Sequence, residues 1–234
     1  MTRVQLLSNQ VHVWMQDIQT LNDKTIEKQA QCLSIDERKR ADRFVHNVDS
    51  KRLLIAYSGL RMLLSNYLSM PSASFNFEQN DHGKPYIADS PICFNLSHSG
   101  DWIIWAFSLN NELGIDIEYE KENVEILALA KRFFAAKEYH ALKNTVPENQ
   151  LSTFYRCWTR KEAFIKAIGK GLSYPLNKFE VPLKEEALDW EIRIKNKSNF
   201  QKWYLYSLRM PEKYTAALVL KKRIEAIQYN KCKI

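Results

Sequence analysis

Two acidic residues stand one position apart in the segment GIDIEYE, residues 114–120. Side chains alternate between the two faces of a β-strand, so Asp116 and Glu118 share one face while Ile115 and Ile117 share the other. A surface strand with a solvated polar face is the ordinary explanation of this pattern. The alternative is that the two carboxylates form one wall of a chemical site.

A second group of candidate residues lies in WTRKEAFIKAIGKG, residues 158–171. Trp158, Glu162 and Lys166 recur every four residues, which places them along one stripe of a helix. An exposed Glu–Lys pair, which stabilises a helix by about 0.3–0.5 kcal/mol, would explain the two charges. Phe154 lies one turn earlier and makes that end of the stripe apolar, which favours a position facing a cleft.

A meeting of Glu162 with Asp116 and Glu118 would gather three carboxylates, whose charges need a cation. Oxygen ligands suit Mg²⁺ or Ca²⁺, whereas no His or Cys accompanies them at a spacing typical of zinc ligands. Because Mg²⁺ is commonly shared between protein carboxylates and substrate phosphates, this set of residues points to phosphate chemistry.

The segment FNLSHSG, residues 94–100, places a serine next to a histidine. Adjacent residues of a strand point to opposite faces and no G-x-S-x-G motif is present, so Ser97 and His98 are not expected to form a nucleophile–base pair. His98 either packs in a hairpin or contacts a ligand phosphate at the mouth of a cleft. Lys84, in the turn HGKP, is either solvated or part of the same site.

The composition limits the classes of protein and partner. The 234 residues are 45% hydrophobic, with four separated cysteines, no C-x-x-C motif and no signal-peptide or membrane-spanning run, so a cytoplasmic protein is expected. The net charge is +7, and residues 111–234 hold 23 Lys+Arg against 16 Asp+Glu. A basic half is compatible with an acidic partner, a phosphorylated ligand, nucleic acid or a solvated surface.

The basic segment DERKRADRF, residues 36–44, is expected to be a mixed-charge solvated face of a short helix. Acidic residues interrupt its basic ones, and no zinc finger, RNA-binding signature, P-loop or G-x-G-x-x-G motif accompanies it.

The order of the predicted elements repeats once along the chain. Residues 50–69 have helical apolar spacing, Phe75 and Phe77 fit a short strand, and residues 93–109 read as strand, turn, strand. Residues 152–171 then predict a helix that ends at glycines, residues 178–183 an extended segment, and residues 204–220 a second hairpin with a turn at Pro211. The pattern predicts an α+β fold of two similar halves, 1–111 and 112–234, with a ligand cleft between them.

Several motifs occur in the order typical of one enzyme family. GIDIE, WTRKEAFIKAIGKGL, HGKPYI, FNLSHSG, AKRFFAAKEY and GLSYPLNKF together resemble the 4′-phosphopantetheinyl transferases of the Sfp type over roughly residues 34–180. The resemblance implies a pseudo-twofold α+β fold in one chain, with coenzyme A and Mg²⁺ in the central cleft.

The resemblance also implies roles for individual residues. By position, Asp116, Glu118 and Glu162 match the metal carboxylates, and Glu162 and Lys166 match the catalytic base and the lysine near the reacting phosphate. The positions that match coenzyme contacts are Arg40, Arg52, Lys84, Ser97, His98, Asp116, Glu162 and Lys166. Glu37 replaces a lysine found in some relatives, and Glu138 matches a recurrent family glutamate without an assigned role.

The implied reaction transfers phosphopantetheine from coenzyme A to a serine of an apo acyl or peptidyl carrier protein and releases adenosine 3′,5′-bisphosphate. The basic second half would suit an acidic carrier protein, and one chain that supplies both halves of the cleft favours a monomer. Two alternatives stay open: an Mg²⁺-dependent phosphohydrolase with water as nucleophile, and a basic binder of nucleic acid whose affinity falls steeply with salt.

Overall fold

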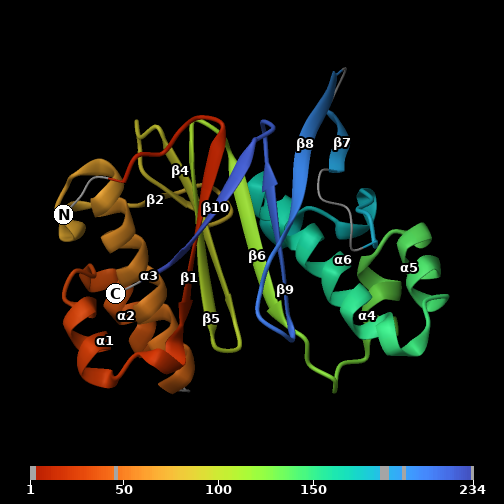
Figure 1. The fold of residues 1–234 in the computed structure, drawn as a ribbon, viewed down its shortest axis with the longest axis horizontal. Helices are drawn as coiled ribbons and strands as arrows, with labels where there is room; N and C mark the ends of the chain where they lie inside the picture. The colour runs from red at the N-terminus through yellow and green to blue at the C-terminus, as the bar shows by residue number, and fades with distance from the viewer. Residues whose placement is uncertain (1–3, 45–46, 185–189, 197–198, 233–234) are drawn as a thin grey trace.

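The fold was obtained as a computed structural model that describes residues 4–44, 47–184, 190–196 and 199–232 (Figure 1). Two four-stranded sheets lie in the centre, with helices outside each of them. The helices are α1 (Asp23–Ala30), α2 (Ile35–Asp42), α3 (Asn47–Leu68), α4 (Ile126–Phe133), α5 (Ala136–Lys143) and α6 (Pro147–Ala167). The 3-10 helices are η1 (Ile18–Thr20), η2 (Ser72–Ser74), η3 (Gly171–Ser173) and η4 (Leu176–Lys178).

The two main sheets share a run of three equivalent strands, and each sheet adds a fourth strand at a different edge. The N-terminal sheet has the order β10-β1-β5-β4, and the C-terminal sheet has the order β6-β9-β8-β7. The strands are β1 (Gln10–Asp17), β4 (Ile92–Ser99), β5 (Trp102–Leu109), β6 (Leu113–Tyr119), β7 (Trp190–Asn196), β8 (Asn199–Leu208), β9 (Tyr214–Leu220) and β10 (Ala226–Lys231), and β2 (Glu78–Gln79) pairs with β3 (Pro85–Tyr86) in a small separate sheet.

In each half the first strand pairs with the second strand of the closing hairpin, and that strand pairs with the first strand of the hairpin. β1 pairs antiparallel with β5 and β5 with β4, just as β6 pairs antiparallel with β9 and β9 with β8. The long helices α3 and α6 fall at equivalent places in this order. The mixed α+β fold expected from the sequence is therefore confirmed, and the strand order shows its internal repeat.

Alternation along the strands explains how four layers are held together. In β5, Ile103, Trp105 and Phe107 pack with α3, whereas Ile104 and Ala106 face the C-terminal sheet. In β9, Ala217 and Val219 likewise pack with α6, and their neighbours along the strand face the N-terminal sheet. Because both faces of the central strands are buried, these strands read as continuous apolar runs. The layers run helix, sheet, sheet, helix (Figure 1).

The division at residues 111/112 falls between β5 and β6, and the last strand crosses back over it. β10 pairs in parallel with β1, so the C-terminal residues complete the N-terminal sheet. The assignment of 1–111 and 112–234 as two structural halves stays a prediction.

The short strand expected after the first long helix was placed wrongly, and the extended segment expected after the second forms no strand. The strand expected at Phe75 and Phe77 is preceded by η2 and begins only at Glu78, and residues 178–183 contain the end of η4 and no strand. The reason is that a buried cation of the preceding long helix binds backbone oxygens of each segment. Arg61 donates to the carbonyls of Ser72 and Phe75 at 3.1 and 3.0 Å.

Lys161 does the same in the second half. Its Nζ donates to the carbonyls of Leu176 and Phe179 at 2.8 and 2.7 Å. Each cation also forms a buried ion pair with a glutamate of the preceding short helix: Arg61 with Glu37 at 2.9 Å and Lys161 with Glu138 at 2.7 Å. Glu37 and Glu138 each accept the backbone N–H three residues earlier as well. These contacts give both glutamates a structural role.

Other expectations from composition can be compared with the structure directly. All four cysteines are free thiols, and Cys157 and Cys232 are buried. Among the described residues, no helix combines the length and apolarity needed to cross a bilayer.

The buried pair Lys161–Glu138 should contribute strongly to folding. Glu138→Gln leaves the Lys161 ammonium, which is 0% exposed, without its counter-charge. We expect the free energy of unfolding to fall by about 3–5 kcal/mol, measured by urea denaturation. Glu180→Gln is the matched control, because its pair with Lys137 is exposed, and it should change stability by less than about 1 kcal/mol. Equal effects of the two substitutions would contradict the assignment.

Candidate functional site

A cavity of about 320 Å³ lies where the two halves meet. It receives side chains from β4, β6 and α6, and six of its lining residues were singled out from the sequence as site residues. The lining residues are Leu96, Ser97, His98, Asp116, Glu118, Trp158, Glu162 and Lys166. Residues more than 60 positions apart in the chain therefore share one cavity.

Close packing of β6 against α6 brings the acidic residues together. A side-chain carbon at Gly114 would collide with the backbone of α6 at Ala163 and Ala167. Only glycine allows this approach, since any larger residue would push strand and helix apart. Ile115 and Ile117 pack between the two sheets, so alternation turns Asp116 toward α6.

The centre of the cavity is a hydrogen-bonded group of three side chains. The Lys166 ammonium donates to Asp116 Oδ1 at 2.7 Å and to Ser97 Oγ at 2.9 Å. Ser97 Oγ in turn donates to the same Asp116 oxygen at 2.9 Å. Lys166 therefore does not form the exposed helical pair with Glu162 that the spacing alone allowed, but bonds across the cavity to β6.

Polar side chains of β4, at the edge of the N-terminal sheet, form hydrogen bonds to β6, at the edge of the C-terminal sheet. Asn95, Ser97 and Ser99 alternate along β4 and bond across to β6. Asn95 Oδ1 accepts the backbone N–H of Ile115 at 2.9 Å, and Ser99 Oγ accepts that of Tyr119 at 3.0 Å. Ser99 also donates to Glu118 Oε2 at 2.9 Å. These side chains hold β6 and its carboxylates in register with β4.

Burial, together with the negative charge of Asp116, raises the pKa of two carboxyl groups. Burial, followed by the charge of Asp116, raises the pKa of Glu162 to about 7. Burial and Asp116 also raise the pKa of Glu118, which Ser99 and Lys166 partly oppose. A cation between these groups would relieve both effects.

The donor set fits a hard metal ion in type. Asp116 Oδ2 is buried and has no hydrogen-bond partner among the described residues, so one carboxylate oxygen is available to a ligand. Mg²⁺ is usually held by one or two carboxylates and completes its shell with water and substrate oxygens. Within the described chain, no three Asp, Glu, His or Cys side chains are already grouped as a complete metal site. Substrate oxygens would therefore have to complete the coordination.

His98 lies at the edge of this cavity with Arg52 close by. Desolvation lowers the pKa of His98, and the positive charges of Lys166 and Arg52 lower it further, which favours the neutral ring. Arg52 donates to the Gly100 carbonyl at 2.9 Å in the turn after β4 and pairs with Asp49. Arg52 therefore supports the turn that follows the strand carrying His98.

Arg40 and Lys84 do not line this cavity. Arg40 lies over the Tyr57 ring, with its guanidinium carbon 5.4 Å from the ring centre. The Lys84 ammonium donates to the carbonyls of Leu113 and Ala167 at 2.7 and 3.2 Å. Lys84 thus connects the first half to the start of β6 and the end of α6, and nearby Asn80 donates to the Gly169 carbonyl at 2.8 Å.

Sequence reasoning missed the supporting residues Asn95, Ser99 and Gly114. The only signal that could have found the first two is their spacing of two from Ser97 along a strand. Their function depends on which strand lies beside β4, which no local pattern reveals.

Comparison with known proteins is consistent with this arrangement. The family described as "4'-phosphopantetheinyl transferase superfamily" matches residues 112–219, and "4'-phosphopantetheinyl transferase, N-terminal" matches residues 20–110. The chain is 39% identical to 4'-phosphopantetheinyl transferase psf-1 of Bacillus pumilus, over 72% of this chain and 73% of that protein.

Two further relatives match a similar share of this chain. Identity is 38% to 4'-phosphopantetheinyl transferase Sfp of Bacillus subtilis, over 71% of this chain and 73% of that protein. Identity is 35% to 4'-phosphopantetheinyl transferase HetI of Nostoc sp., over 76% of each chain. The chain belongs to the 4′-phosphopantetheinyl transferase superfamily, which confirms the resemblance drawn from its motifs.

Ser99 should act by positioning Glu118. Ser99→Ala removes the hydroxyl that bonds both Glu118 and the Tyr119 backbone, so we expect weaker binding of Mn²⁺, measured by electron paramagnetic resonance, and about 10–100-fold lower transferase activity. Ser99→Thr keeps the hydroxyl and should restore most of both. Ser152→Ala, on the distant part of α6, is the control. Unchanged Mn²⁺ affinity in Ser99→Ala would refute this role.

Lys84 should make stability depend on pH. Burial lowers its pKa from 10.5 to about 8, so between these values the unfolded chain binds a proton that the folded protein lacks. The contribution of Lys84 to stability therefore rises as pH increases from about 8 to 10.5. Lys84→Met should lower the free energy of unfolding by about 1–3 kcal/mol at pH 7, because two carbonyls lose their donor. Urea unfolding should show the difference from wild type widening with pH; a constant difference would contradict this.

Proposed function

We propose that this protein transfers the 4′-phosphopantetheine group from coenzyme A to a serine hydroxyl of an apo carrier protein, with Mg²⁺ as cofactor. Adenosine 3′,5′-bisphosphate is the second product. The observation that carries the proposal is that Asp116, Glu118, Glu162 and Lys166 line one cavity between the halves, together with Ser97 and His98. Family membership adds the reaction class.

Asp116, Glu118 and Glu162 would hold the Mg²⁺ ion. When bound, the ion neutralises charge on pyrophosphate oxygens and so favours displacement at phosphorus. The buried, unpartnered Asp116 Oδ2 supports this assignment, since an uncompensated buried carboxylate oxygen costs free energy until a ligand meets it.

Lys166 supplies a fixed positive charge at the same place. Its ammonium is already oriented by Asp116 and Ser97, so little reorganisation is needed when negative charge develops on the phosphate oxygens. Such preorganisation acts on the transition state more than on the bound substrate.

Glu162 is the proposed general base for the serine hydroxyl. Its carboxylate lines the cavity with Lys166, where it can accept the proton of an incoming serine hydroxyl. Glu162 lies on helix α6 beside Trp158, whose ring packs on Phe154 with ring centres 5.9 Å apart. This packing keeps the Glu162 carboxylate directed at the cavity.

Ser97 and His98 are the proposed coenzyme contacts inside the cavity. The neutral ring of His98 can donate one hydrogen bond to a phosphate oxygen, and the Ser97 hydroxyl can follow when a ligand displaces part of its present network. Arg40, Arg52 and Lys84, which the resemblance implies as further coenzyme contacts, stay predictions.

The acceptor is proposed to be an acidic acyl or peptidyl carrier protein. Residues 111–234 carry the whole positive excess of the chain, which would attract an acidic partner and orient it at the cleft. Since one chain supplies both walls of the cavity, we propose that a monomer is sufficient for activity.

The direct test is mass spectrometry of apo carrier proteins after incubation with coenzyme A, Mg²⁺ and the enzyme. We expect a mass increase equal to phosphopantetheine, which chelation of divalent cations abolishes. Glu162→Gln should lower the rate by about 10²–10⁴-fold because the proton acceptor is lost. Asp116→Asn should also be impaired at saturating coenzyme A.

Glu148→Gln, an exposed carboxylate on the same helix, is the control and should keep wild-type activity. Release of adenosine 3′,5′-bisphosphate without any carrier protein would instead indicate a hydrolase. Full activity of Glu162→Gln would overturn the assigned base.

A further inference from the structure

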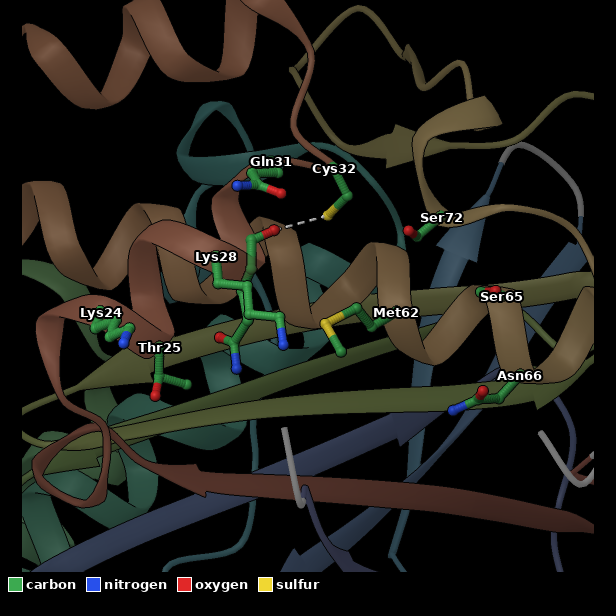
Figure 2. Close-up of a pocket in the computed structure, with 10 residues that line it drawn as sticks. Lys24, Thr25, Lys28, Gln31, Cys32, Met62, Ser65, Asn66 and Ser72 are labelled. Atoms are coloured by element: carbon green, nitrogen blue, oxygen red, sulfur yellow. Dashed lines mark hydrogen bonds between the residues drawn. The ribbon is translucent and has the colours of Figure 1, made fainter.

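A second cavity lies away from the catalytic cleft, between α1 and the C-terminal half of α3. Its volume is about 750 Å³, compared with about 320 Å³ for the catalytic cavity, and no residue lines both. The lining residues, shown in Figure 2, are Lys24, Thr25, Lys28, Gln29, Gln31, Cys32, Met62, Ser65, Asn66 and Ser72. A volume of this size accommodates a small organic molecule.

The charge of the lining is of one sign. Lys24 and Lys28 contribute two ammonium groups, and none of the ten lining residues is acidic. The acidic residues of α1 are Asp23, which is paired with Lys51 at 2.6 Å, and Glu27, which does not line the cavity. The cavity therefore favours a negatively charged ligand.

The polar and apolar groups are arranged along the cavity. Figure 2 shows Lys24 and Thr25 at one end, Met62 in the middle, and Ser65 and Asn66 at the other end. Met62 offers a flexible thioether side chain, which adapts to apolar ligands of different shapes. A ligand with an anionic head and a short apolar chain would match this order.

One buried polar group of the wall lacks a partner. Gln29 is only 9% exposed, and its Oε1 atom has no hydrogen-bond partner among the described residues. A buried carbonyl oxygen without a donor is costly, and a carboxylate or phosphate group brings acceptors only, so a bound water that donates both to Gln29 Oε1 and to the anionic group would satisfy this wall. This observation is independent of the charge and shape of the cavity.

The cysteine of the wall is not suited to covalent capture. Burial raises the pKa of Cys32, and its Sγ donates to the Gln29 carbonyl at 3.1 Å. Because the thiolate is the reactive form, binding here is expected to be non-covalent.

From these observations we propose that the α1–α3 cavity is a binding site for a small organic anion, a carboxylate or a phosphate monoester that carries a short apolar chain. Lys24 and Lys28 bind the anionic group and Met62 contacts the chain. This site is separate from the proposed transfer reaction, so neither depends on the other.

Methionine-methyl NMR of the full-length protein gives a local readout. The probes are hexyl phosphate and hexanoate, with hexanol and hexylammonium as uncharged and cationic counterparts. We expect the Met62 methyl signal, assigned with Met62→Leu, to shift saturably with at least one anion at millimolar concentration. The signals of Met15 and Met210, which lie outside this cavity, should stay in place.

Variants then test the charge requirement. Lys24→Gln combined with Lys28→Gln should weaken anion binding at least about tenfold, because both charge-assisted contacts are lost. The matched control is Lys39→Gln combined with Lys143→Gln, two exposed lysines away from the cavity. Transferase activity should be unchanged in both double variants.

The outcomes are distinguishable. Preference for hexyl phosphate assigns a phosphate monoester, and preference for hexanoate assigns a carboxylate. No saturable shift of Met62 with either anion, equal binding of hexylammonium, or unchanged affinity in the Lys24/Lys28 double variant would each overturn the proposal. Loss of transferase activity alone would concern the proposed function and not this site.

Discussion

The close contact of β6 with α6 is the constraint on which the candidate active site depends. At Gly114 the strand lies directly against the helix backbone at Ala163 and Ala167, with no room for a side chain. Alternation two residues later turns Asp116 toward α6, where Lys166 meets it at 2.7 Å. A wider separation would break this bond and disperse the carboxylates. The glycine that begins the GIDIE motif is thus as important to the site as its two acids.

The two halves of the chain are stabilised by the same kind of buried ion pair. A buried cation of the long helix, Arg61 or Lys161, pairs with a glutamate of the preceding short helix and binds carbonyls of the following segment. In each half, one buried cation therefore connects the short helix, the long helix and the segment that follows the long helix. Breaking such a pair leaves a charge buried without compensation, which is far more costly than losing a surface pair.

Much of the site could be predicted from local patterns, because those patterns decide which side chains share a face. The spacing of four places Glu162 and Lys166 on one stripe, and alternation places Asp116 with Glu118. The same patterns weighed an exposed pair of Lys166 with Glu162 against a position facing a cleft, and in the structure Lys166 bonds to Asp116 and Ser97 across the cavity. The coenzyme contact that the resemblance implies for Lys84 stays a prediction, and in the structure its ammonium donates to backbone carbonyls of the other half.

The sequence alone determined the two long helices, the two hairpins, the family and the candidate acids, since helical and strand periodicities and short motifs are local properties of the chain. It also determined that the chain repeats one order of elements. Only the tertiary structure decided which edges of the two sheets meet, so the roles of Asn95, Ser99 and Gly114 emerged there. It also showed that Glu37 and Glu138 are counter-charges of buried cations. The reason is physical: pairing across 20 or more residues depends on how layers pack, and packing is a property of the whole chain.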